Sequence, residues 1–235
     1  TTVGNAAGLK DALDAGKDVI LTENIALTEP LRISKDATIT GNGYAVISEH
    51  PVDVDPAAEV TFDGVNFATP DNANNNASSV YASGLEGKVV FDGCTFTNPQ
   101  WECIQITPVD GAEIVVTNCT FIVDGTETYA HGDKVERMLH IQNTAATGDY
   151  KVTVTNNKFI GVDKVNNSVI DIDDITAFDN VICGGNSFAN ADGTAVTTLA
   201  DGQIYVNLNR KYDAASVATG TFAQFTQSPA AALHH

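Results

Sequence analysis

The chain has 235 residues, of which 43% are hydrophobic, and a formal net charge of −18 from 30 acidic and 12 basic residues. This acidic excess argues against a nucleic-acid partner, because phosphate binding relies on clustered Lys and Arg. It also opposes unaided binding of acidic polysaccharides. No run of 18 apolar residues occurs, so no membrane insertion is expected. The length and hydrophobic content suffice for one continuous core.

A short helix is predicted at the start of the chain. Asn5 is a suitable N-cap, Leu9, Ala12 and Leu13 share one face, and Gly16 is placed to end the helix. Residues 5–16 are therefore expected to cover the open end of the fold that follows. At the other end, residues 211–229 are interpreted as a C-terminal cap or linker, and residues 230–235 as a vector and tag remnant.

Six copies of a six-residue pattern organise the chain between these ends. Each copy has an apolar residue first, Gly or Asn third, and an aromatic residue sixth. Only Gly and Asn adopt positive φ at low cost, so the third position predicts a sharp corner between two short strands. The aromatic positions are 23, 29, 25, 38 and 29 residues apart, which is typical of one turn of a solenoid. The copies span Ile39 to Tyr44, with Gly41 third, and then residues 62–67, 91–96, 116–121, 154–159 and 183–188.

A second repeat lies upstream of each corner. Its apolar and polar residues alternate, which predicts a strand with one face in the core and the other in water. Strands stacked about 4.8 Å apart from coil to coil form parallel sheets around one core. The segments are 31–34, 52–55, 80–83, 104–107, 139–142, 170–173 and 204–207.

With these two repeats, residues 1–210 resemble the right-handed parallel β-helices of the pectate-lyase-like superfamily. The resemblance implies a single all-β domain, a right-handed parallel β-helix of about six to seven coils. The superfamily includes lyases, hydrolases, adhesins and phage appendages, so it fixes no activity. The opening strands of the chain also resemble those of secreted and surface β-helix proteins of bacteria. We therefore expect a secreted or cell-surface location.

The outward positions of the alternating strands form the main candidate site. Carboxylates, amides and aromatic rings on one flat surface suit a neutral sugar polymer, which needs rings to stack on and partners for its hydroxyls. The alternative is a solvated face without a ligand. Trp101, in a turn beside this face, either covers the core or stacks on a ligand. The residues assigned to ligand binding are Tyr81, Gln105, His140, Asp171, Asp173, Tyr205 and Trp101.

Two long loops interrupt the regular coil length, at about residues 69–79 and 124–136. Both lead directly into an alternating strand, so both are expected to flank the same sheet. Loops beside a rigid surface often take part in recognition, and simple tolerance of insertions is the alternative.

Several acidic residues and His131 allow enzymatic interpretations of the outer face. Asp171, Asp173 and Asp174 offer oxygen ligands for Ca²⁺, and the resemblance to pectate lyases implies a nearby Arg or Lys base, for which Arg137 is closest. Polygalacturonase-like hydrolases have a Gly-His-Gly motif after an Asp-Asp pair, whereas here His131 precedes Asp173, and further motifs are missing. We therefore assign no catalytic residue, no metal ligand and no cofactor, with Ca²⁺ as the alternative.

The fourth position of the corner repeat carries Cys94 and Cys119 in adjacent copies. As neighbours in the stack they either form a disulfide or remain two buried thiols. Other copies have Asn at this position, including Asn157 and Asn186, which predicts a ladder of buried amides along the core.

Taken together, the sequence favours a non-enzymatic, exported module that recognises a glycan or another cell-surface ligand, similar to an adhesin or a phage appendage. A polysaccharide lyase or glycoside hydrolase acting on the outer face is the first alternative. A structural spacer in a larger assembly is the second. The sequence does not indicate an oligomeric state.

Overall fold

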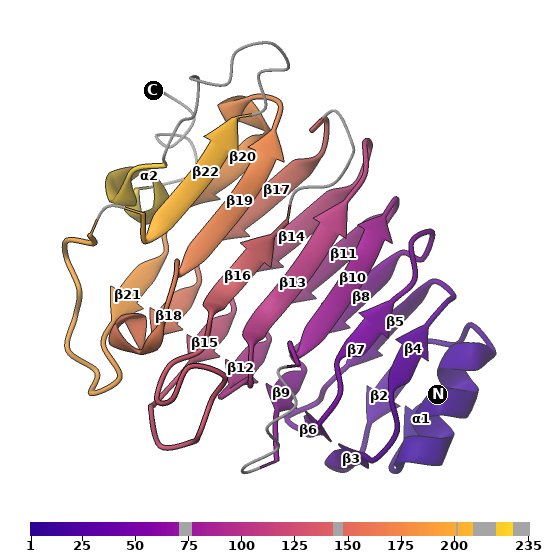
Figure 1. Ribbon diagram of the computed structural model, residues 1–235. Coiled ribbons are helices and arrows are strands. Elements are labelled where there is room, and N and C mark those ends of the chain that lie inside the picture. The colour runs from indigo at the N-terminus through magenta and orange to yellow at the C-terminus, as the bar shows by residue number, and fades with distance from the viewer. Residues whose placement is uncertain (71–76, 143–147, 201, 209–219, 228–235) are drawn as a thin grey trace.

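The protein is a parallel β-solenoid built from three sheets of parallel strands, as a computed structural model shows (Figure 1). The structure describes residues 1–70, 77–142, 148–200, 202–208 and 220–227. Residues 71–76 of the first predicted loop lie outside this part of the chain. So do most of the predicted C-terminal cap or linker and all of residues 230–235.

Each coil contributes one strand to each of three sheets, which we name A, B and C. Sheet A contains β1 (Thr2–Val3), β2 (Val19–Leu21), β5 (Ala37–Thr40), β8 (Val60–Asp63), β11 (Lys88–Asp92), β14 (Glu113–Thr117), β17 (Lys151–Thr155) and β20 (Val181–Gly184). Sheet B contains β3 (Ile25–Leu27), β6 (Ala45–Ser48), β9 (Asn66–Ala68), β12 (Thr95–Thr97), β15 (Thr120–Ile122), β18 (Lys158–Ile160) and β21 (Ser187–Ala189). Sheet C contains β4 (Leu31–Ile33), β7 (Val52–Val54), β10 (Val80–Leu85), β13 (Glu102–Pro108), β16 (Arg137–Ile141), β19 (Ile170–Ile175) and β22 (Ile204–Leu208). The seven alternating segments of the sequence are therefore the seven strands of sheet C.

A ladder of phenylalanine rings runs through the core, as the corner repeat predicts. Phe159 stacks on Phe121 with ring centroids 4.6 Å apart, and on Phe188 at 5.2 Å. The stack continues through Phe96 and Phe67, at centroid spacings of 5.0 and 4.9 Å. Stacked rings at this separation gain aromatic contact in addition to the burial of apolar area.

The first copy of the corner repeat departs from this register. Ile39 pairs with Phe62, but the residue opposite Phe67 is Val46 and not the predicted Tyr44. The two core positions are therefore 46 − 39 = 7 residues apart in the first copy and 67 − 62 = 5 residues apart in the second. Two extra residues in this corner move Tyr44 out of the ladder, and it packs half-buried against the core.

Positive φ occurs at the predicted corner position in the other five copies. The angles are 62° at Gly64, 66° at Gly93, 56° at Asn118, 58° at Asn156 and 69° at Gly185. In the first copy the left-handed residues are Asn42 and Gly43, so the assignment of Gly41 to this conformation is wrong. Gly41 has a different reason to be glycine, because a Cβ there would lie 2.1 Å from the carbonyl oxygen of Gly64.

The predicted amide ladder is present between Asn157 and Asn186. The Asn157 side chain accepts from the Cys119 backbone N–H at 2.9 Å and donates to Val116 O and to Asn186 Oδ1, both at 3.0 Å. Cys94 and Cys119 are free, buried thiols. The Cys119 Sγ donates to the Phe91 carbonyl at 3.4 Å, which leaves thiols as the observed state of the two alternatives.

Helices close the two ends of the described solenoid (Figure 1). Helix α1 (Ala6–Asp14) begins after Asn5, whose side chain accepts from Gly8 N at 2.8 Å, and it buries the predicted apolar face. At the other end, α2 (Phe222–Thr226) buries Phe225, whose carbonyl accepts from the Asn186 amide group at 2.8 Å. Two 3-10 turns occur within the coils, η1 (Val162–Lys164) and η2 (Phe178–Asn180). In the described part of the chain no helix has the length and apolarity needed to cross a membrane.

Candidate functional site

The predicted row of outward residues lies in register across sheet C. Tyr81 pairs with Gln105, Gln105 with His140, His140 with Asp171, and Asp171 with Tyr205. The row extends in the other direction from Tyr81 through Asp53 to Arg32. The alternation of the sequence therefore places all of these side chains on one outer face, but the two halves of that face differ.

The half formed by β4, β7 and β10 is open and contains a hollow of about 280 Å³, which we call the Tyr81 hollow. Arg32 is exposed, and its Nε donates to Asp55 Oδ1. Burial raises the pKa of the half-buried Asp53 carboxyl, although the Arg32 charge opposes this shift. The hollow is lined by Arg32, Asp53, Val54, Asp55, Pro56, Tyr81 and Ser83.

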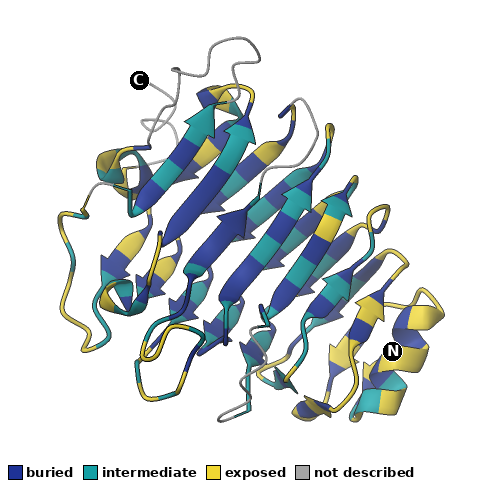
Figure 2. Cartoon of the chain, in the orientation of Figure 1, coloured by how far each residue is buried: buried dark blue, intermediate teal, exposed yellow. Residues whose placement is uncertain are grey.

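The half formed by β13, β16 and β19 is shielded from solvent. Figure 2 shows β16 coloured as buried along most of its length, whereas exposed segments interrupt β4 and β10. His140 and Asp171 point outward but are only 5% and 6% exposed. The expectation that these two side chains lie in water is therefore wrong, because neighbouring side chains cover them.

A break in the alternation brings additional charged residues to this half. Met138 N and Leu139 N both donate to the Val169 carbonyl, at 3.2 and 3.0 Å. Met138 and Leu139 are consecutive and both fully buried, although β16 keeps a constant register with β13 and β19. Arg137 consequently reaches the same outer face as His140, as its contact with Asp171 shows.

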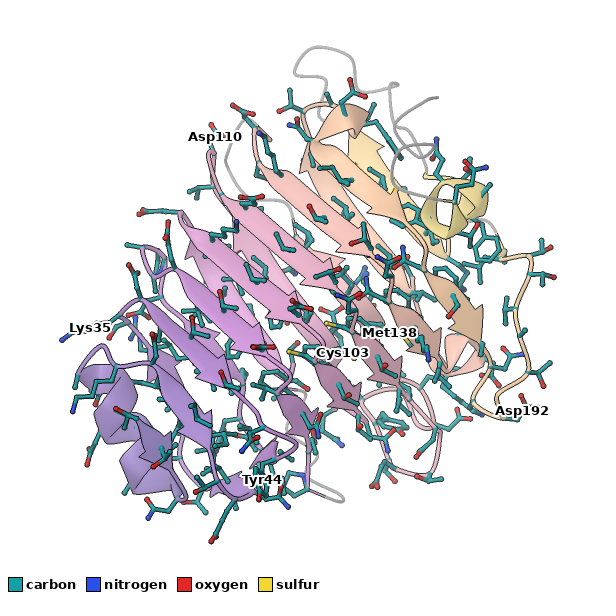
Figure 3. All side chains as sticks on the ribbon, turned by 180° about the vertical axis from the view of Figure 1, so that it is seen from behind. Lys35, Tyr44, Cys103, Asp110, Met138 and Asp192 are labelled. Atoms are coloured by element: carbon teal, nitrogen blue, oxygen red, sulfur yellow. The ribbon has the colours of Figure 1, made fainter. Side chains whose placement is uncertain are left out.

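Two consecutive buried residues also occur at the corresponding place in each neighbouring strand. Cys103 and Ile104 are both fully buried, as are Val169 and Ile170. Figure 3 labels Cys103 and Met138, which belong to adjacent strands of sheet C. Before Cys103 comes Glu102, which faces Arg137 across the strand pair.

Five side chains on this half form what we call the charge network: Glu102, Arg137, His140, Asp171 and Asp173. Glu102 is fully buried and contacts His140 Nδ1 through Oε1 at 2.9 Å. Arg137 donates from NH1 to Glu102 Oε2 at 3.2 Å and from Nε to Asp171 Oδ2 at 2.9 Å. The other imidazole nitrogen, His140 Nε2, lies 3.9 Å from Asp171 Oδ2 and 3.8 Å from Asp173 Oδ2.

Burial and neighbouring charge act on these groups in opposite directions. Burial lowers the pKa of His140, but the carboxylates of Asp173 and Glu102 outweigh it and raise the value to about 9. Burial and then the Asp173 charge raise the pKa of Asp171. Burial also acts to raise the pKa of Asp173, yet the contacts with His140 and Asp171 lower it overall. Neighbouring carboxyl groups of this kind cannot both ionise easily without a positive partner.

The second predicted loop, residues 124–136, covers one side of the network. Its Ala130 N donates to Gln100 O and its Glu136 N to Trp101 O, at 3.1 and 2.9 Å. Trp101 is half-buried, and its ring centroid lies 5.4 Å from that of His131. This loop therefore flanks sheet C as predicted, and Trp101 contacts the loop at the edge of the face.

Glu136 joins the loop to the network. Its carboxylate contacts His131 Nε2 and lies 3.5 Å from Arg137 NH1. Asn166 and Asn167 each donate to it at 3.2 Å. Burial acts to raise the pKa of Glu136, but these two hydrogen bonds, together with the charges of Arg137 and His131, lower it overall.

The other predicted site residues lie outside the network. Gln105 is held between two neighbours, since it accepts from Ser78 Oγ at 2.7 Å and donates to Gln142 Oε1 at 3.2 Å. Tyr205 is half-buried at the far end of the row, beside Asp171. Tyr81 belongs to the hollow, so the predicted residues divide between two separate places on the face.

The Ca²⁺ alternative at Asp171, Asp173 and Asp174 stays a prediction, and the close group of ligand atoms has a different composition. Asp174 has a left-handed φ of 52° at a bulge between Ile172 and Ile175. The close group of potential ligands is instead His140, Asp171 and Asp173, with ligand atoms within 4.8 Å of one another. An imidazole nitrogen in this group is unsuited to Ca²⁺, which prefers oxygen ligands.

Sequence reasoning missed Glu102 as a site residue and treated Arg137 only as a lyase base. The available signal was two consecutive apolar residues at the start of a strand, in Cys103-Ile104, Met138-Leu139 and Val169-Ile170. Strict alternation ignores such pairs, although each one shifts the preceding residue to the outer face.

Comparison of the chain with protein-family models, curated proteins and solved structures gave no match.

Proposed function

We propose that the outer face of sheet C binds a neutral glycan in the Tyr81 hollow, and that the protein is a non-enzymatic, exported recognition module. We also propose that the chain belongs to the pectate-lyase-like superfamily, which its parallel β-solenoid and its repeat pattern favour. The observation that carries the proposal is an aromatic ring beside carboxylates in a hollow on an otherwise flat sheet.

The chemistry of the hollow suits a sugar. The Tyr81 ring offers an apolar surface for the C–H face of a pyranose, and Asp53 and Asp55 offer acceptors for its hydroxyls. Arg32, which follows Tyr81 and Asp53 in the row, supplies donors. The row continues to Gln105 in the next coil. At about 4.8 Å per coil, the face can accommodate a second sugar unit along the stack.

A binding role fits the face better than catalysis by Asp171 and Asp173. Their side chains are only 8% and 24% exposed. Arg137 and His140 occupy positions next to them. A substrate would have to displace these partners before either carboxyl group could reach a glycosidic oxygen. The Tyr81 hollow is accessible without such rearrangement.

The test combines a glycan array with titration of the strongest array ligand. Tyr81→Ala is expected to weaken binding by at least about 1 kcal/mol, or roughly fivefold, because a few contacts dominate such sites. Tyr81→Phe retains the ring and is expected to bind nearly as well as the parent. Tyr205→Ala, at the distant end of the same row, serves as the control for a general effect of aromatic truncation.

A reducing-end assay on acidic and neutral polysaccharides completes the experiment. We expect no product. Product formation that Asp171→Asn abolishes would favour the alternative, a lyase or hydrolase. Unchanged glycan binding by Tyr81→Ala would remove the hollow as the binding site.

A further inference from the structure

Three potential metal ligands converge on the outer face of sheet C from two adjacent strands. His140 comes from β16, and Asp171 and Asp173 come from β19. His140 Nε2 lies 3.9 Å from Asp171 Oδ2 and 3.8 Å from Asp173 Oδ2. A tetrahedral ion with ligand bonds near 2.1 Å separates its ligands by about 3.4 Å. These two distances from His140 Nε2 therefore have to contract by about half an ångström for one ion to bind, and all three ligand atoms lie within 4.8 Å of one another.

One oxygen of this group has no partner of its own. Asp171 is 6% exposed, and its Oδ1 is buried without a hydrogen bond. Arg137 Nε holds the other oxygen, Oδ2, at 2.9 Å. A buried carboxylate oxygen without a hydrogen bond is costly, because the desolvation of the group is not compensated. A cation would satisfy it only if Asp171 bound the ion through Oδ1 or through both of its oxygens, because Oδ2 is the oxygen that faces His140 Nε2.

The histidine is already oriented for metal binding. Its Nδ1 contacts the fully buried Glu102 carboxylate at 2.9 Å. In the neutral imidazole, donation from Nδ1 to a carboxylate leaves the lone pair on Nε2, the nitrogen that faces Asp171 and Asp173. Because the pKa of His140 is raised to about 9, a metal ion has to displace the Nε2 proton to bind there. This carboxylate–histidine arrangement recurs behind the metal-binding histidines of proteins.

We propose that His140 Nε2, Asp171 and Asp173 bind one divalent transition-metal ion, with Zn²⁺ as the best-matched probe. The nitrogen donor and the small separation favour Zn²⁺ over Ca²⁺, which takes six to eight oxygen ligands. Asp173 is the most exposed of the three, with 24% of its side chain accessible, and marks the side from which an ion enters. Three protein ligands leave a fourth position of a tetrahedral ion for water.

The surrounding charge also favours a cation. Glu102, Glu136, Asp171 and Asp173 supply four carboxylates, whereas Arg137 supplies one positive charge that contacts three of them. With His140 neutral, the group has a net charge of about −3, so a divalent ion reduces the repulsion between the carboxylates. Without metal, a proton on Nε2 is the competing occupant.

The experiment is calorimetric titration of Zn²⁺ into the full chain after chelator treatment. Binding of one ion per chain is expected, and Asp173→Asn is expected to weaken it at least tenfold. Asp53→Asn removes a carboxylate from the same row outside the group, and is expected to bind like the parent. Glu102→Gln, which loses the orienting carboxylate but keeps the ligands, is expected to weaken binding about 10- to 100-fold.

Two measurements keep the result interpretable. The titration is repeated with His234→Ala and His235→Ala together, because these terminal histidines, outside the described residues, are themselves metal ligands. Circular dichroism and thermal melting of each variant establish that it is folded. Co²⁺ substitution adds a spectroscopic test, since a tetrahedral site with a nitrogen ligand gives strong visible absorption that Asp173→Asn should remove.

The proposal fails if folded Asp173→Asn binds Zn²⁺ as tightly as the parent. It also fails if replacing only His234 and His235 abolishes binding. It also fails if no binding occurs at micromolar Zn²⁺, which would identify the group as an ion-pair network only. Displacement of Zn²⁺ by millimolar Ca²⁺ would replace the transition-metal assignment with a calcium site. Metal binding is independent of glycan binding, so neither result decides the other.

Discussion

The two halves of the outer face of sheet C have the same alternating sequence and very different environments. Around Tyr81 the polar side chains meet solvent and line a hollow, and Arg32 is 73% exposed in its side chain. Around His140 the polar side chains meet one another, and the Arg137 side chain is only 16% exposed. Both halves contain an Arg–Asp pair, Arg32–Asp55 and Arg137–Asp171. Only the second pair is built into a buried network.

This difference shows that the direction of a side chain does not determine its environment. Alternation decides which residues leave the core, whereas breaks in alternation and loops decide what covers them afterwards. In the second half, the consecutive buried residues Met138 and Leu139 bring Arg137 to the face, and Glu136 at the end of the loop contacts it. Charged groups crowded in this way interact more strongly than the same groups in water.

A substitution in the core shared by both halves gives the loss of stability against which substitutions on the face can be compared. Phe159→Ala removes a fully buried ring between Phe121 and Phe188. We expect a loss of about 3–5 kcal/mol in the free energy of unfolding, from lost burial and a residual cavity. Chemical denaturation of parent and variant measures it. A neutral result would mean that the aromatic register is wrong and that the face has to be reassigned.

Among substitutions on the face, Arg137→Ala is expected to cause the largest loss in the free energy of unfolding. It leaves the buried Glu102 without its guanidinium partner and removes the donor that contacts Asp171 Oδ2 at 2.9 Å. Breaking a buried ion pair on one side costs about 3–5 kcal/mol.

The matched control is Arg32→Ala, in the open half. Because Arg32 is solvated, we expect no measurable change in the denaturation midpoint. Equal effects of the two substitutions would show that the halves do not differ energetically.

His140→Ala sharpens the comparison because it removes the imidazole ring from the charge network. It leaves Glu102 Oε1 without its contact at 2.9 Å. Loss of one partner of a buried acceptor costs about 1–3 kcal/mol. Its counterpart in the same row, Tyr81→Ala, is expected to change stability by no more than about 0.5 kcal/mol, because it leaves no core cavity. Thermal melts in the presence of a chelator measure both, and a loss for Tyr81→Ala as large as for His140→Ala would contradict the division.

Much of the fold could be predicted because its repeats act locally. Asn118 and Gly93 indicate the corners, and the spacing from Phe121 to Phe159 indicates a coil enlarged by a loop. The first coil was misassigned because Tyr44 satisfies the pattern by type, while two inserted residues place Val46 in the ladder. Sequence alone does not show which of two nearby apolar residues faces the core.

The candidate site was predictable only in part. The row from Tyr81 to Tyr205 follows directly from a period of two. The burial of His140 does not, because it depends on Glu102 and Arg137, which reach the face through departures from that period. The pairing of Glu102 with Arg137 also joins residues 137 − 102 = 35 positions apart, with a whole loop between them.

The helices at the two ends have a consequence for how such a molecule can change over evolutionary time. α1 covers the first coil and α2 contacts the last, while each coil between them pairs chiefly with its two neighbours. If an internal coil is duplicated or deleted, α1 and α2 therefore still have a terminal coil to pack against. Each duplication would lengthen the outer face by about 4.8 Å and add one more position to the row. In such a protein the number of coils sets the length of the outer face, and recombination can change that number without altering the residues within each coil.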